Sequence, residues 1–155
     1  MSSRSGESPR RGAPPAPGPG DSPGFLLWRV TLRWQRLMAA SLRPLGLTHV
    51  QFVLLGSTWW LTEVAGETPT QRRVADHAGT DPMMTSQVLR ALESKGLVTR
   101  LASPADSRAR RVTVTAIGAV LARRAVAVVE AADVDFFASA GDRRALLSTL
   151  HHLDR

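Results

Sequence analysis

The side chains with the clearest chemistry lie within residues 80–111, which combine hydroxyl, amide and guanidinium groups. The spacing predicts a helix whose solvent-facing stripe contains Met83, Gln87, Arg90 and Ser94, with Ser86 beside it. A polar turn, SPADSRA, follows, with arginines at its tip. Amide and guanidinium groups form paired hydrogen bonds with base edges and phosphates. We therefore expect a surface for a nucleic acid duplex, with the helix in the major groove and the tip in the minor groove.

Capping residues and glycines indicate which elements hold this surface. Asp81 can accept a hydrogen bond from a free backbone N–H, and Pro82 suits a first helical turn, so the helix is expected to begin there. Its predicted inward stripe contains Thr85, Val88, Leu89 and Leu92. Gly96 can adopt the left-handed turn that ends a helix. Alternating valines then predict a hairpin formed by residues 97–102 and 110–115.

A second short helix is expected just upstream. Thr70 can cap residues 71–78, and a glycine ends them, so a tight turn joins two short helices. This is the helix-turn-helix arrangement, and the hairpin makes it winged. Further upstream, Thr48 and Gln51 fit a capping box at the start of an apolar, buried helix. Residues 62–69 are expected to form a loop.

Apolar helices are predicted at both ends of the folded region. Residues 25–43 and 115–153 offer more apolar surface than one hairpin can cover, and a partner subunit explains this simply. Residues 1–24 are rich in Pro, Gly and Ser and are expected to be a disordered tail. The predicted fold class is mainly α with a small β-hairpin wing. A winged helix-turn-helix core at about 48–115 sits within a domain of residues 25–153, between N- and C-terminal dimerisation helices.

Charge and composition narrow the class of partner. The net charge is +7 over 155 residues, and residues 25–113 carry +6 of it, from twelve basic and six acidic side chains. A polyanion is the natural partner of such a region. Of the 20 basic residues only Lys95 is a lysine. Arginine suits bidentate contacts, although a bias in codon usage would give the same ratio.

The chain contains no cysteine, which excludes a disulfide framework and a thiolate metal site. No apolar run approaches the roughly 20 residues of a membrane span. The first residues lack the apolar segment of a secretory signal. We therefore expect a cytoplasmic protein with no membrane partner.

Four segments, taken in order, carry a family resemblance. They are Leu47-Thr48 with Gln51 and Leu54-Leu55; Thr70-Gln71 with Val74-Ala75; Leu92-Glu93 with Lys95-Gly96-Leu97-Val98 and Arg100; and Asp106-Ser107-Arg108-Ala109 with Val112-Thr113-Val114-Thr115 and Gly118. Together they resemble the MarR (multiple antibiotic resistance regulator) family of winged helix-turn-helix transcriptional regulators. The resemblance covers about residues 25–153 and implies a homodimer built from the first and last helices.

The resemblance also implies roles for individual residues. The major-groove bases would be read by Ser86, Gln87 and Arg90. The wing would place Arg108 in the minor groove, with Arg110 and Arg111 near the phosphates and Asp106 bracing the wing through an ion pair. Many relatives carry a basic residue in place of Gln87, and another in place of Ser107. The sequence of the operator therefore cannot be transferred from them.

A small-molecule site is a further implication. The family often binds small aromatic or phenolic anions between the dimerisation helices and the DNA-binding lobe. The candidate pocket residues here are Trp28, Arg33, Trp34, His49 and Trp59. Tryptophans on apolar helix faces more often belong to a core, so both interpretations stay open.

These observations predict a dimeric, sequence-specific DNA-binding transcriptional regulator that recognises an inverted-repeat operator, and a repressor relieved by a small ligand. The alternative is a winged-helix protein-interaction module without sequence-specific DNA binding, against which the basic charge argues. No enzyme activity, cofactor or metal is expected. His151 and His152 are adjacent on a helix and point about 100° apart, which suits a shared ligand sphere poorly. The sequence also has no phosphate-cradling glycine loop and no nucleophile elbow.

Overall fold

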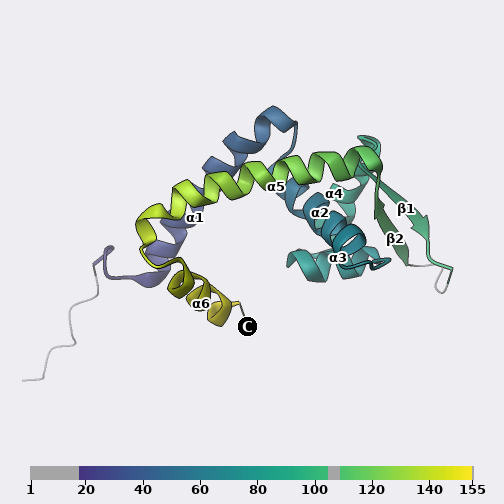
Figure 1. Ribbon diagram of the computed structural model, residues 1–155. Helices are drawn as coiled ribbons and strands as arrows, with labels where there is room; N and C mark the ends of the chain where they lie inside the picture. The colour runs from purple at the N-terminus through teal and green to yellow at the C-terminus, as the bar shows by residue number, and fades with distance from the viewer. Residues whose placement is uncertain (1–17, 105–108, 155) are drawn as a thin grey trace, which may run out of the picture. The chain divides into compact units, whose positions relative to one another are not determined.

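The structure, a computed structural model, describes residues 18–104 and 109–154. They fall into two compact units that divide inside the first helix, between Arg33 and Trp34. The helices are α1 (Pro23–Leu42), α2 (His49–Trp59), α3 (Gln71–Ala78), α4 (Pro82–Ser94), α5 (Ala116–Phe137) and α6 (Arg143–Leu153), and the strands are β1 (Val98–Ala102) and β2 (Arg110–Val114) (Figure 1). Short 3-10 turns cover Arg43–Leu45 and Ala138–Ala140, and a π-helical turn covers Trp60–Val64.

Helices α3 and α4 form the helix-turn-helix that the capping residues predict. The Thr70 hydroxyl accepts a hydrogen bond from the Arg73 N–H at 3.2 Å, which caps α3. Asp81 caps α4 in the same way, because its Oδ1 accepts from the Met84 N–H at 2.9 Å. Gly79 lies between them with a φ of 65°, a left-handed conformation that a residue with a Cβ adopts only at a cost. The expected turn is thus confirmed.

The wing is a two-stranded antiparallel hairpin, also as predicted. Val98 pairs with Val114 and Arg100 pairs with Val112, so these four side chains share one face of the hairpin. The hairpin is also joined to the segment before α3. The Val112 N–H donates to the Pro69 carbonyl at 2.9 Å, and Thr70 forms a bridge with Arg111. This third stretch fixes the wing relative to the start of α3. Figure 1 shows β1 and β2 side by side, next to the N-terminal end of α5.

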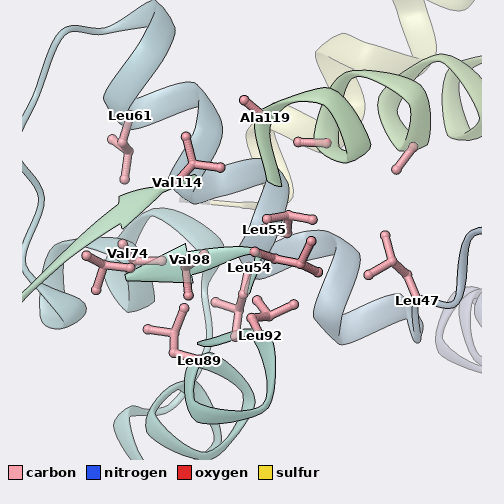
Figure 2. Close-up of a cluster of buried hydrophobic side chains, with 14 of the residues drawn as sticks. Leu47, Leu54, Leu55, Leu61, Val74, Leu89, Leu92, Val98, Val114 and Ala119 are labelled. Atoms are coloured by element: carbon pink, nitrogen blue, oxygen red, sulfur yellow. The ribbon is translucent and has the colours of Figure 1, made fainter. Parts of the chain in front are cut away.

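The core that supports these elements is apolar and gathers around α2. Leu54 and Leu55 of α2 are fully buried, together with Leu89 and Leu92 of α4. Figure 2 shows them with the wing valines Val98 and Val114 and with Ala119 of α5. Burying a leucine side chain contributes about 2 kcal/mol, so this cluster holds both α4 and the wing against α2. The burial of α2 confirms its predicted central place.

Two element boundaries differ from the expectation. Helix α1 begins at Pro23, two residues before the expected start. Residues 62–64 were expected in a loop, but they belong to the π-helical turn that extends α2. The Thr58 hydroxyl donates to the Leu54 carbonyl at 2.8 Å, and the Thr62 hydroxyl donates to the Thr58 carbonyl at 2.8 Å. Both hydroxyls thus bond carbonyls one turn back, an arrangement compatible with a helix that runs on into the wider turn.

Helix α5 packs through its smallest residues. The buried positions are Gly118, Ala119, Ala122, Ala125 and Val129. The larger apolar side chains of Ile117 and Val120 are 72% and 51% exposed. A face of glycine and alanine allows a close approach between α5 and its neighbours.

Candidate nucleic-acid interface

The outer stripe of α4 is exposed to solvent, as expected from its spacing. Gln87 and Arg90 are exposed, Ser86 is half-buried, and Met83 is 82% exposed. The Arg90 Nη2 donates a hydrogen bond to the Ser86 Oγ at 3.0 Å, which lays the guanidinium along the helix surface. The amide of Gln87 and the guanidinium of Arg90 are both able to form bidentate contacts with base edges. The stripe is therefore available to a groove without any rearrangement of α4.

The arginines of β2 point to opposite faces of the hairpin. Arg110 pairs with Ala102 and shares a face with Arg100, whereas Arg111 pairs with Leu101 on the other face. The face with Arg110 and Arg100 also carries the buried Val98 and Val112, so it turns toward α4. Both arginines were predicted near phosphates, and the register places their side chains on opposite faces of the hairpin. The predicted wing residues Arg108 and Asp106 lie outside the described residues.

A bidentate ion pair joins the end of α4 to β1. The guanidinium of Arg100 donates to the Glu93 Oε2 at 2.7 and 2.9 Å, and the Arg100 backbone N–H donates to the Glu93 Oε1 at 3.2 Å. The hydrogen bonds from Arg100 hold the pKa of the Glu93 carboxyl below its usual value, and the positive charges of Arg100 and Arg110 act in the same direction. Glu93 therefore stays ionised and ties the wing to the recognition helix.

Glu93 and Arg100 join the recognition helix to the wing, although neither was predicted as a site residue. Seven positions separate them, across a helix end and a turn, so no helical or strand periodicity brings them together. The signal available in the sequence was the segment that carries the family resemblance, in which both residues occur.

A second cluster of polar and aromatic groups lies between α1, α2 and α5. The indole Nε1 of Trp34 donates to the Asp133 Oδ1 at 2.7 Å. The ring of His49 meets the Trp34 ring edge to face, with centroids 4.9 Å apart. Burial lowers the pKa of His49 from its ordinary value of 6.5, and the charge of Asp133 offsets part of that effect. His49 is therefore neutral at pH 7.

Two of the five predicted pocket residues, Trp34 and His49, meet within this cluster. Trp34 and His49 are in contact, while Trp59 is half-buried against the hydrophobic core. Trp28 is 61% exposed and belongs, with Arg33, to the first compact unit. The sequence did not indicate Asp133, because it lies 99 positions from Trp34 and has no local motif around it.

Within residues 18–104 and 109–154, no three His, Cys, Asp or Glu side chains lie close enough to hold a metal ion. Over the same ranges, none of the helices has the length and apolarity that crossing a membrane requires.

An exposed polar recognition helix, a capped helix-turn-helix and a basic wing define the class of winged helix-turn-helix DNA-binding proteins. Residues 47–109 match the model of the MarR family. The chain is 43% identical to the HTH-type transcriptional regulator YdcH of Bacillus subtilis. The 136 aligned residues cover 88% of this chain and 92% of YdcH. The chain therefore belongs to the MarR family, and it is a DNA-binding transcriptional regulator.

Solved structures give the same result. CouR of Rhodococcus jostii, bound to p-coumaroyl-CoA, superposes with a TM-score of 0.74 at 28% identity, over 89% of this chain and 93% of that one. Rv2887 of Mycobacterium tuberculosis, in complex with salicylic acid, superposes with a TM-score of 0.63 at 36% identity, over 85% and 96% of the two chains. The winged helix-turn-helix fold expected from the sequence is confirmed.

Proposed function

We propose that this protein is a homodimeric repressor that binds an inverted-repeat operator and releases it when a small aromatic or phenolic anion binds. The observation that carries the proposal is the exposed stripe of α4, held beside a basic wing by the Glu93–Arg100 ion pair. In this arrangement Gln87 contacts adenine and Arg90 contacts guanine in the major groove, with Ser86 beside Arg90.

The wing supplies the remaining DNA contacts. Arg108 enters the minor groove at the tip of the hairpin, and Asp106 braces it through an ion pair, as the family resemblance implies. Arg110 and Arg111 contact phosphates. Because their side chains lie on opposite faces of the hairpin, they contact different phosphates of the DNA backbone. Two relatives with this fold, CouR and Rv2887, have been solved in complex with DNA, which supports the assignment.

Exposed apolar side chains at both ends of the chain support the homodimer. In the first unit, α1 exposes Leu27 at 58% and Trp28 at 61%. In the second, α5 exposes Val134 at 64% and α6 exposes Leu153 at 72%. Several large exposed apolar side chains on the terminal helices are typical of a protein interface. A two-fold dimer places its recognition helices about 34 Å apart, which matches successive major grooves of one duplex face.

The effector site is built around the Trp34, His49 and Asp133 cluster. Trp34 offers an aromatic surface, and a neutral His49 can donate or accept a hydrogen bond at an anionic or phenolic oxygen. The family resemblance also implies Trp28, Arg33 and Trp59 as candidate effector-binding residues. Rv2887 binds salicylic acid and p-aminosalicylic acid, and CouR binds p-coumaroyl-CoA, so aromatic acids are the class to test.

Release of DNA follows from differential binding. The effector binds more tightly to a dimer in which the spacing of the two recognition helices does not fit the operator. The loss of operator affinity can be no larger than this difference in effector affinity between the two states. We place this regulatory, non-catalytic activity in the cytoplasm, where the operator lies.

The first experiment selects bound genomic fragments across about 50–200 mM salt, because non-specific phosphate binding falls steeply over that range. Recovery of a short inverted repeat at the higher salt supports the repressor. Fragments that bind without preference and all wash off support instead a protein-interaction module. The Gln87→Ala, Arg108→Ala double variant is expected to lose operator retention while sedimenting as a dimer; unchanged retention contradicts the contact assignment.

The effector assignment is tested separately, by titrating salicylate into the operator complex. The Trp34→Leu and Asp133→Asn variants are expected to keep DNA binding and to require at least tenfold more salicylate for release. Trp60→Leu is a matched control, because Trp60 stacks on His77 elsewhere on the surface, with centroids 5.1 Å apart. Equal salicylate sensitivity in all variants contradicts the proposed pocket.

A further inference from the structure

A polar cavity lies between the recognition helix and the wing. Its volume is about 480 Å³, and its lining residues are Gln71, Ser86, Arg90, Glu93, Arg100 and Arg110. They come from α3, α4, β1 and β2, so the cavity lies where all four elements of the winged helix-turn-helix meet. On the hairpin face that carries Arg100, the neighbouring Val98 and Val112 belong to the apolar core.

The charges around this cavity favour an anion. Three arginines line it and one glutamate opposes them, which leaves a surplus of two positive charges. The Glu93 carboxylate is already occupied by three hydrogen bonds from Arg100. Arg110 lies near enough to Glu93 to contribute to the lowered pKa of its carboxyl, so it extends the positive region across the cavity.

An unsatisfied polar atom points to a missing ligand. The Oε1 of Gln71 is buried and has no hydrogen-bond partner among the described residues. A buried acceptor without a donor is costly, so such an atom commonly marks a place where a partner binds. If the side-chain amide turns over, its N–H groups take the position of the oxygen, and an anionic oxygen in the cavity can accept from them.

The position of the cavity identifies the anion. When α4 lies in the major groove and the wing lies in the adjacent minor groove, one sugar–phosphate strand must pass between them. The cavity opens between these two elements, so the strand that separates the grooves passes over it. Ser86 and Arg90, which also line the cavity, are proposed to reach base edges, so Gln71, Arg100 and Arg110 are left for the phosphate.

We propose that this cavity is a phosphate pocket, which receives one backbone phosphate of each half-site and fixes the register between the major-groove and minor-groove contacts. Arg100 and Arg110 hold the phosphate, and Gln71 donates to it from α3. The inference rests on the proposed DNA contacts of α4 and the wing, and it adds Gln71 and Arg100 to the residues that bind DNA.

The first test measures how operator affinity depends on salt. Each phosphate contact contributes about 0.9 to the slope of log affinity against log salt, so Arg110→Gln in a dimer should reduce the slope by about 1.8. Affinity at fixed salt should fall roughly tenfold to a hundredfold, with the preference among base sequences unchanged. Arg123→Gln is the matched control, because it removes the same charge from an exposed position on α5; it should change the slope by less than half as much.

The second test identifies the phosphate itself. Operator duplexes that carry one neutral methylphosphonate at successive backbone positions are titrated with wild-type protein and with Arg110→Gln. Neutralising the pocket phosphate should weaken wild-type binding about tenfold or more and should cost the variant less than half of that factor. Gln71→Glu, which adds a negative charge to the cavity, should lose affinity as Arg110→Gln does and show the same loss of coupling.

The outcomes separate the pocket from the wider function. If wild-type protein retains no operator at any salt, the proposed DNA contacts fail, and the pocket fails with them. If wild-type protein binds its operator but no methylphosphonate position couples to Arg110, only the phosphate pocket is overturned. A change of base preference in Arg110→Gln, without a change of salt slope, also overturns it, because the cavity would then receive a base.

Discussion

The single lysine of the chain, Lys95, ties the end of the recognition helix to the start of α2. Its Nζ donates to the Gln51 Oε1 at 3.0 Å and to the Gly46 carbonyl at 2.9 Å. The same Gln51 Oε1 accepts from the Thr48 N–H at 3.2 Å and so completes the capping box of α2. His49, in the proposed effector site, is the first residue of α2. The start of α2 is thus in contact both with the proposed effector cluster and with α4.

Replacing Lys95 by methionine keeps most of its length and removes these hydrogen bonds. We expect the free energy of unfolding to fall by about 1 kcal/mol, because hydrogen bonds to charged groups are moderately strong but this one is exposed to solvent. Urea denaturation measures the change. Arg123→Met, which removes one exposed charge from α5, should change stability by less than about 0.5 kcal/mol. A Lys95→Met, Gln51→Ala double-mutant cycle that shows no coupling contradicts the assigned contact.

Gly118 is required by the contact between α5 and the wing. A Cβ at this position would overlap with the Leu97 carbonyl oxygen, which also accepts the Thr115 N–H at 3.0 Å. Gly118→Ala is therefore expected to destabilise the protein by about 3 kcal/mol, because backbone on both sides resists displacement. Thermal or urea unfolding measures this.

Gly56→Ala is the matched control for that substitution. A Cβ at Gly56 of α2 would have its nearest neighbour, in Phe52, at 3.8 Å, an ordinary contact. Alanine also favours the helix by up to about 1 kcal/mol over glycine. We expect this variant to be as stable as the wild type or more so. Equal effects of the two substitutions would show that α5 can move away from the wing.

The sequence predicts the local elements of this fold because each one has its own capping residues. Thr48, Thr70 and Asp81 accept the backbone hydrogen bonds expected of them, and glycine takes the left-handed conformation at Gly79 and Gly96. These are interactions between residues at most three positions apart, so local sequence patterns predict them. The exposed stripe of α4 follows from the same short-range regularity.

Contacts between distant residues could not be predicted in this way. The Trp34–Asp133 hydrogen bond spans 99 positions, and the polar cavity combines side chains from four elements. The inward face of α5 contains Gly118 and Ala122, whereas the more hydrophobic Ile117 is exposed. Such choices depend on the shape of the neighbouring surface, which periodicity does not encode.

The neutral state of His49 makes stability depend on pH. Burial lowers its pKa from 6.5, so below pH 6.5 the unfolded chain takes up a proton at this site before the folded protein does. The free energy of unfolding should therefore decrease as the pH falls from about 7 to about 5. His49→Gln should show a shallower decrease, measured by urea denaturation at each pH. His152→Gln leaves the Trp34 cluster intact and should keep the wild-type decrease; identical curves for all three proteins contradict the assignment.

The Glu93–Arg100 ion pair gives a pH dependence in a lower range. The pKa of Glu93 is lowered from 4.5 by its hydrogen bonds with Arg100, so the stabilisation is fully present above pH 4.5 and is lost as the pH falls through the lowered pKa. Glu93→Gln should therefore be less stable than wild type by about 1 kcal/mol at pH 7, an upper value for a partly exposed pair. The difference should shrink toward pH 3, and urea denaturation across that range measures it.

Glu67→Gln is the control for Glu93→Gln, because it removes the same charge from an ion pair that does not involve the wing. The side chains of Glu67 and Arg73 are 36% and 43% exposed, against 37% for Glu93 and 17% for Arg100. Solvent screens the Glu67 pair more, so its loss should cost less than about 0.5 kcal/mol. Glu93→Gln should also reduce the ratio of operator to non-specific DNA affinity, because Glu93 fixes the wing beside α4, while Glu67→Gln should preserve that ratio. If both variants preserve it, the ion pair stabilises the fold without positioning the wing.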